Sequence, residues 1–163
     1  MKLPKIDFEK YNYPLRTLLL GNSDTWQAMS AVIEDLTQKQ FAYQYTQIKQ
    51  RSIAQMLDHA MDTQYGFYTK KLVMGEDLPP NLYKKPVKTV REAQKRIAET
   101  FQKTVELWEK LTPEDFQKEI QTEWGQVLTG ELALFQSITH THYHVSEICF
   151  LRGLGGFPTT AMG

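Results

Sequence analysis

The sequence predicts an all-α protein, a four-helix bundle whose helices are joined by long crossover loops. Apolar residues recur at three- and four-residue intervals in four long segments, which is the spacing of one buried face on a helix. Polar residues that cap helix N-termini open the first three of these segments, and glycine or proline follows the last three. No segment has both a strong alternating pattern and a second segment to pair with, so no sheet is expected.

The N-terminal part is predicted to contain a lead-in, one short helix and one long helix. Residues 1–13 read as an irregular lead-in, and residues 14–20 as a short helix ended by Gly21. A polar cap then opens the first long helix over residues 23–37, which in an alternative interpretation extends backward through the glycine. Residues 41–49 alternate weakly but lack a partner strand, so the region 38–50 is expected to be an extended loop.

The second long helix is predicted to start after Ser52 and to run to about Val73. Ser52 and Gln55 fit a capping box, and apolar residues follow at helical spacing. Residues 75–88 contain three prolines and are expected to form a loop that crosses from one end of the bundle to the other.

The C-terminal half is predicted to hold the third and fourth long helices. A second capping box opens the third helix over residues 89–111. A threonine cap, an N1 proline and first-turn acids then predict a short helix over residues 113–120. Residues 121–128 are expected to be a connector, and the fourth long helix is predicted over residues 129–152, before a glycine-rich end.

Length and composition limit the possible classes of protein. The 163 residues are most simply one domain, residues 1–163, long enough to bury a core. The 19 basic residues equal the 19 acidic ones and are scattered, which argues against a nucleic-acid partner. The apolar runs are too short to span a bilayer, so no membrane partner is expected. The absence of a hydrophobic signal core and the single cysteine, Cys149, favour the cytoplasm.

Three of the four histidines lie in one segment, residues 139–147. On a helix, His140 and His144 are about 40° apart around the axis, so both imidazoles can reach one metal ion. His142 lies about 160° from the bisector of that pair and cannot join it. The fourth histidine, His59, lies in the second predicted helix. A third ligand therefore depends on whether the fold brings His59 to His140 and His144.

Three neutral imidazoles with a bound water form an open metal site, in which the ion acidifies a bound nucleophile. Because Cys149 lies away from the histidine face, zinc, nickel, iron and manganese are the candidate metals. Glu147 continues the face of His140 and His144 and suits either a catalytic base or an acceptor for a histidine proton. On the residues alone, histidines that only hydrogen-bond in a core or meet solvent remain the alternative.

Two segments resemble the DinB/YfiT-like superfamily of metal-dependent enzymes. Residues 52–65 resemble the second helix of that family, which contributes one metal-binding histidine. Residues 140–155 resemble its pattern H-x3-H-x-G-Q-I-x2-L-R, and Trp124-Gly125 and Thr129 stand where the family has a WG pair and a threonine before the last helix.

Carried over position by position, the metal ligands implied by this resemblance are His59, His140 and His144. Ser146 and Glu147 stand where glycine and glutamine are usual in the family. The metal triad is therefore retained, whereas the groups around it, and with them the substrate chemistry, differ from the family pattern.

The resemblance implies a thiol S-transferase that joins a low-molecular-weight thiol, such as bacillithiol or mycothiol, to a small electrophilic substrate. One divalent metal ion, most simply zinc or nickel, would hold the thiol as thiolate, with iron or manganese as alternatives. The competing interpretations are a hydrolase that uses metal-activated water, with Glu147 as base, and a bundle that binds a metal or ligand without catalysis. The resemblance also implies a homodimer.

Overall fold

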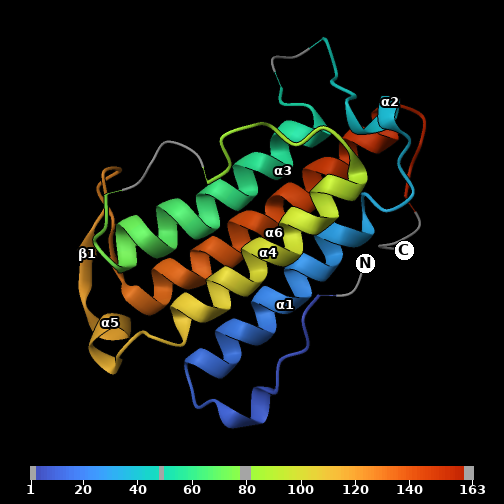
Figure 1. The fold of residues 1–163 in the computed structure, drawn as a ribbon. Coiled ribbons are helices and arrows are strands. Elements are labelled where there is room, and N and C mark those ends of the chain that lie inside the picture. Colours follow the sequence, from blue (N-terminus) through green and yellow to red (C-terminus); the bar gives the residue numbers. More distant parts are fainter. Residues whose placement is uncertain (1–2, 48–49, 78–81, 160–163) are drawn as a thin grey trace.

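Four long helices make up most of the protein, as predicted. The computed structural model describes residues 3–47, 50–77 and 82–159. The helices lie side by side in a bundle (Figure 1). They are α1 (Leu15–Ala31), α3 (Ile53–Met61) with its continuation η2 (Asp62–Val73), α4 (Val90–Trp108) and α6 (Gly130–Leu154). A single turn of 3₁₀ helix, η1 (Phe8–Lys10), precedes them.

The four helices contact one another in a ring. Helix α6 packs against α1 on one side and against α3 and η2 on the other, and α4 packs against the same two neighbours. Both α6 and α4 therefore lie between α1 and the α3–η2 helix. The buried apolar side chains of all four form one core, with Trp26, Phe101 and Trp108 among its largest members.

Helix α1 runs without a break through Gly21, so the separate short helix predicted over residues 14–20 is wrong and the alternative of a backward extension is correct. A Cβ at this glycine would lie 3.7 Å from the Ile138 side chain, so Gly21 packs closely against α6. The helix ends at Ala31, earlier than the predicted residue 37. One reason is that the Val32 carbonyl accepts a hydrogen bond from the Arg152 guanidinium at 2.6 Å.

The region 38–50 contains a helical turn, α2 (Gln38–Phe41), where an extended loop was predicted. Thr37 caps its N-terminus, and the Gln40 side chain accepts a hydrogen bond from the Thr37 backbone N–H at 2.9 Å. Phe41 is fully buried and secures the turn against the bundle. Residues 48–49 of the predicted loop lie outside the described residues.

The second long helix has the predicted extent, but its C-terminal half is a π-helix. The Thr69 hydroxyl donates to the Gln64 carbonyl, five residues earlier, at 2.9 Å, and accepts from the Trp108 indole at 3.0 Å. The Gln64 side-chain oxygen in turn accepts from the Trp26 indole at 2.6 Å. All these groups are buried, so the wider turns are held by hydrogen bonds from α1 and α4. Such π-turns are frequent at functional sites.

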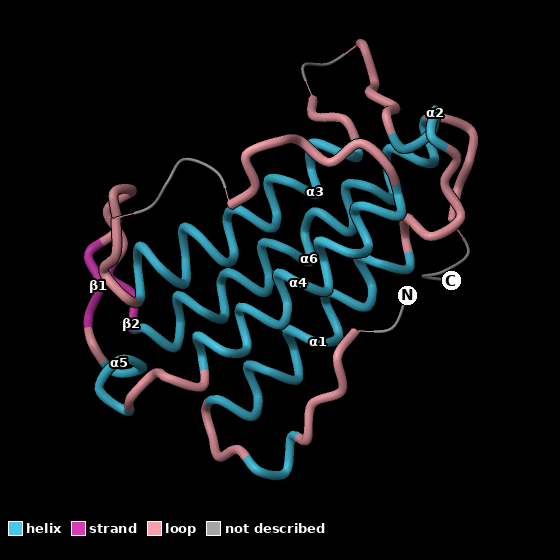
Figure 2. The backbone as a smooth tube through the Cα atoms, in the orientation of Figure 1, coloured by secondary structure: helices cyan, strands magenta, loops and turns pink. Residues whose placement is uncertain are grey.

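A two-stranded antiparallel sheet joins the short helix to α6, so the predicted absence of strands is wrong. Helix α5 (Pro113–Gln117) ends earlier than predicted, and β1 (Glu119–Gln121) pairs with β2 (Val127–Thr129) across the region predicted as a connector (Figure 2). Gly125 has a φ of 85° in the intervening turn, a conformation that suits glycine. Strands of three residues are too short to give a clear alternating pattern.

We expect Gly130→Ala to destabilise the protein by roughly 3 kcal/mol, because the added methyl group has no room. A Cβ at Gly130 would lie 1.8 Å from the Asp115 carbonyl oxygen, and backbone cannot give way as a flexible side chain can. Urea unfolding measures the loss. The matched control is Gly153→Ala in the same helix, where a Cβ meets nothing within 4 Å. Equal unfolding midpoints for the two variants would contradict the expectation.

The crossover segment between η2 and α4 is a loop, as predicted, and α3 holds part of it in place. The Asp58 carboxylate accepts the Val87 backbone N–H at 2.9 Å, and the Arg96 guanidinium donates to the Lys85 carbonyl at 2.7 Å. Residues 78–81 of this predicted loop lie outside the described residues.

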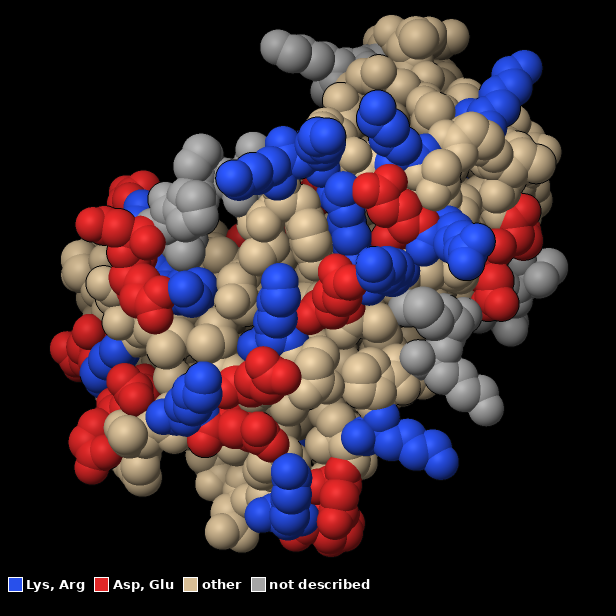
Figure 3. All heavy atoms as spheres, in the orientation of Figure 1, with Lys and Arg blue, Asp and Glu red and all other residues tan. Residues whose placement is uncertain are grey.

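Basic and acidic side chains alternate over the face seen in Figure 3. Among the described residues, no helix is both long and apolar enough to cross a membrane.

Candidate metal site

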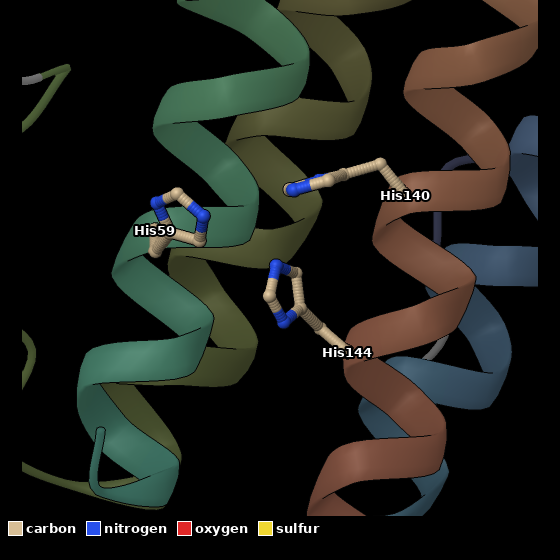
Figure 4. A group of neighbouring side chains, drawn as sticks. All are labelled: His59, His140 and His144. Atoms are coloured by element: carbon tan, nitrogen blue, oxygen red, sulfur yellow. The ribbon is translucent and has the colours of Figure 1, made fainter. Parts of the chain in front are cut away.

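The structure brings His59 to His140 and His144. The three rings face one another across the gap between α3 and α6 (Figure 4). The centroid of the His59 ring lies 5.4 Å from that of His140 and 5.0 Å from that of His144. The centroids of the His140 and His144 rings are 4.5 Å apart. One nitrogen from each ring lies within 4.8 Å of the other two. The convergence expected of these three residues is thus present.

The α6 sequence explains why two of the rings point into this gap. At 100° per residue, the buried core positions Leu134, Thr141 and Ile148 lie on one side of the helix, and His140 and His144 lie on an adjoining side. The register against η2 is fixed by a buried hydrogen bond of 3.5 Å from the Gln64 amide to the Thr141 hydroxyl. Because Thr141 follows His140 directly, this contact positions α6 next to the site.

The environment keeps two of the imidazoles neutral at physiological pH. Desolvation by burial, with smaller contributions from Arg51 and the two neighbouring histidines, lowers the pKa of His59 to about 4. Burial likewise lowers the pKa of His140 to about 4, with smaller contributions from His144 and Arg51. A neutral ring keeps a lone pair for a metal ion.

Hydrogen bonds set which nitrogens remain available. The Nδ1 atom of His144 lies 2.6 Å from Oε2 of Glu147, so an ionised carboxylate there accepts the Nδ1 proton. This leaves the Nε2 atom of His144 as a free acceptor. The Nδ1 atom of His59 also has a hydrogen-bond partner on its own helix, the Thr63 hydroxyl at 3.4 Å.

Two buried nitrogens at the site have no hydrogen-bond partner within the described ranges, Nδ1 of His140 and Nε2 of His144. An unsatisfied buried polar atom is costly and rare in a folded protein. A cation bound between the three rings would take one nitrogen from each of them, so the residues present fit a metal ion.

One further histidine and two tyrosines lie near the three histidines. His142 is exposed on α6 and does not join them, as predicted. The Tyr68 ring lies 6.1 Å from the His140 ring and is partly buried, whereas Tyr143 is 62% exposed. Arg51 was missed, because a single arginine ahead of a helix cap carries no signal of its own.

The metal-free protein is expected to lose stability as the pH falls from 6.5 to about 4. In that range the unfolded chain protonates His59 and His140, whereas the folded chain does not until its lower pKa is reached. After allowance for solvent screening, we expect a loss of about 1–2 kcal/mol for the pair. Urea unfolding at several pH values measures it, with a His59→Gln/His140→Gln variant as control. Identical pH profiles for wild type and variant would contradict the expectation.

Comparisons with known proteins agree with this geometry. A family model described as the DinB superfamily matches residues 22–148, which include all three histidines. The crystal structure of a mycothiol-dependent maleylpyruvate isomerase has a similar fold, with a TM-score of 0.57 and 12% sequence identity over 88% of this chain. This chain spans 63% of that protein, so the likeness shows the fold alone. A search of curated protein sequences found no match.

Proposed function

The chain belongs to the DinB superfamily, and from this membership we propose that it is a metal-dependent enzyme, a thiol S-transferase acting on a small electrophilic substrate. The observation that carries the proposal is the convergence of His59, His140 and His144, with two buried nitrogens lacking a partner among the described residues. The thiol-dependent isomerase with a similar fold supports thiol chemistry in particular.

His59, His140 and His144 would hold one divalent ion, of which zinc and nickel are the first choices and iron and manganese the alternatives. When bound, the ion lowers the pKa of a coordinated thiol or water, so that the nucleophile is an anion at neutral pH. Glu147 holds the His144 ring in one orientation by accepting its Nδ1 proton. Partial burial lowers the pKa values of His59 and His140 and so keeps these two rings unprotonated at neutral pH.

In the proposed reaction, the thiol sulfur attacks an electrophilic carbon. A carbon–sulfur bond forms, the bond to the leaving group breaks, and the thiol proton passes to solvent. An electrophile such as 1-chloro-2,4-dinitrobenzene releases chloride in this step, so no oxidant or reductant is required.

The experiment is a conjugation assay with zinc- or nickel-loaded, untagged protein, 1-chloro-2,4-dinitrobenzene and a panel of thiols that includes bacillithiol and mycothiol. Conjugation above the uncatalysed rate, lost after metal removal, is the expected result. Ester hydrolysis without added thiol would instead support the alternative hydrolase. Metal binding with neither activity would support a bundle that only binds a metal or ligand.

Substitution of Glu147 separates a positioning role from a role as base. We expect Glu147→Leu to weaken metal binding by about 10- to 100-fold, because the His144 ring loses its proton acceptor. Glu147→Gln keeps an oxygen for the same hydrogen bond and is expected to lose only a few-fold. Competition with a chromogenic chelator measures both affinities. If Glu147 were the base of a hydrolase, Glu147→Gln would abolish ester turnover while leaving metal affinity nearly unchanged.

We propose that the protein forms a homodimer through α6. Besides its core face and its histidine face, this helix has an exposed apolar stripe whose side chains are 41–62% exposed. At 100° per residue they fall within an arc of about 100° on the outer side of the helix. The stripe consists of Leu132, Phe135, Tyr143, Phe150 and Leu154. Such exposed stripes commonly mark interfaces between proteins.

Sedimentation equilibrium tests the homodimer. The expected mass of the wild type is twice that of the 19.0 kDa chain, and a Phe135→Glu/Phe150→Glu variant is expected to sediment as a monomer. A wild-type monomer at micromolar concentration would overturn the proposal.

A further inference from the structure

A pocket next to the three histidines carries a positive charge that the metal chemistry does not use. The pocket has a volume of ≈ 620 Å³, within the range of small-molecule sites. It is lined by Gln44, Gln50, Arg51, Gln55, Met56 and Glu147. The segment before α3, the first turns of α3 and the last turns of α6 therefore all contribute to it.

This pocket adjoins the histidine cluster along both helices. Gln55 lies four residues before His59 on α3, and Glu147 lies three residues after His144 on α6, so each is one turn from a histidine. Glu147 also contacts the His144 ring directly at 2.6 Å. None of the three histidines lines the pocket itself, but it begins one helical turn from them, within reach of a molecule bound to an ion between the rings.

Arg51 is placed to bind an anion. It is exposed and lines the pocket, and its positive charge lowers the pKa values of both His59 and His140. In the part of the chain that the structure describes, Arg51 makes no ion pair and no hydrogen bond, although Glu147 lines the same pocket. The Glu147 carboxylate is instead engaged with His144. A guanidinium without a protein partner beside a reactive centre favours a carboxylate on the ligand, which it can bind through two parallel hydrogen bonds.

The glutamines around Arg51 add polar groups that fit such a ligand. The side-chain oxygen of Gln50 is buried and has no hydrogen-bond partner among the described residues. The side-chain oxygen of Gln55 accepts the Ser52 backbone N–H at 2.9 Å, which leaves the Gln55 amide N–H groups to donate to a ligand. The pocket therefore offers a cation, amide donors and one unsatisfied acceptor. The unsatisfied acceptor, the side-chain oxygen of Gln50, suits a hydroxyl or amide N–H of the ligand that lies near the ligand's carboxylate.

We propose that this pocket, centred on Arg51, binds a carboxylate of the molecule that reacts at the metal. The inference rests on the proposed function and adds the substrate class: one reactant is a carboxylic acid whose carboxylate lies beyond the reacting atom, next to Arg51. The carboxylate belongs either to the thiol or to the electrophile. The glutamines contact the polar groups next to it.

The test uses cobalt(II)-loaded protein, in which a bound thiolate produces a sulfur-to-metal charge-transfer absorption band. Mercaptocarboxylic acids of two to six carbons are titrated beside their uncharged mercaptoamides, for wild type, Arg51→Gln and Lys84→Gln. Lys84 lines a neighbouring pocket together with His59 but does not line the proposed site, so its variant removes a nearby charge from outside that site. A carboxylate on the best-fitting thiol is expected to tighten binding about tenfold in wild type and in Lys84→Gln. In Arg51→Gln this preference is expected to disappear.

A second arm needs no metal and no thiol. Metal-free protein is titrated with glutarate while the NMR signal of the Arg51 Nε–H is followed, and a saturable shift of that signal is expected. A shift with glutarate, but no carboxylate preference among thiols, would assign the carboxylate to the electrophile and support the inference.

The experiment distinguishes failure of the proposed carboxylate site from failure of the proposed thiol chemistry. Thiol bands of equal strength for acids and amides, with no glutarate shift, would overturn the carboxylate site and leave the proposed thiol chemistry standing. A glutarate shift without any thiol band would support the carboxylate site and count against the thiol as a reactant.

Discussion

His59→Ala is expected to lower the affinity for a divalent metal by at least about 100-fold, because it removes one of the three proposed ligands, the one on α3. His140 and His144 alone leave a two-ligand site on a single helix. The affinity is measured by competition with a chromogenic chelator on untagged protein. If the enzyme proposal holds, thiol conjugation is lost in parallel.

The matched control is His142→Ala. His142 lies between the two ligands in the sequence but is exposed on another side of α6, so its removal is expected to leave the affinity unchanged. Thermal unfolding of the metal-free variants shows whether either substitution harms the fold. Equal metal affinities for His59→Ala and wild type would show that His59 is no ligand.

Arg152→Met is expected to destabilise the protein by about 3–5 kcal/mol, the largest stability loss that we expect from a single side chain. Arg152 is 1% exposed and ties the end of α6 to the end of α1. Its guanidinium donates to the Val32 carbonyl at 2.6 Å and to both carboxylate oxygens of Asp35 at 2.7 and 2.8 Å. It also donates to the backbone carbonyls of Phe157 and Pro158.

Most of this loss comes from the buried Val32 carbonyl and the part-buried carbonyls of Phe157 and Pro158, which the variant leaves without their donor, and less comes from the ion pair. The Asp35 side chain is 65% exposed, and the hydrogen bond from Arg152 lowers its pKa. Asp35→Asn, the control, is therefore expected to cost less than about 1 kcal/mol. Urea unfolding of both variants tests this order. A larger loss for Asp35→Asn than for Arg152→Met would contradict it.

The closeness of His140 and His144 could be predicted from the sequence because helical geometry alone constrains these two residues. Two residues four apart on any helix share a side, so only the position of His59 depended on the tertiary fold. Resemblance to a family supplied that third member, and the packing of α3 against α6 brings it to the other two. The starts of the second and third long helices followed from caps that the structure contains, Ser52 and Thr89.

Features that depend on packing were harder to predict. A glycine usually weakens a helix, yet α1 continues through Gly21 because that residue lies against Ile138. The π-turns of η2 depend on buried hydrogen bonds from Trp26 and Trp108, which lie on other helices. The outer apolar stripe of α6 was also missed. Its residues mix with core residues in the sequence, so the helix has no clear polar side.

Anomalous diffraction from crystals of untagged protein soaked in zinc tests the central claim most directly. The result expected is one strong anomalous peak at the zinc absorption edge, within bonding distance of a nitrogen of His59, His140 and His144. A peak bound only by other residues, or no peak between α3 and α6 at full zinc saturation, would contradict the metal site and with it the proposed chemistry.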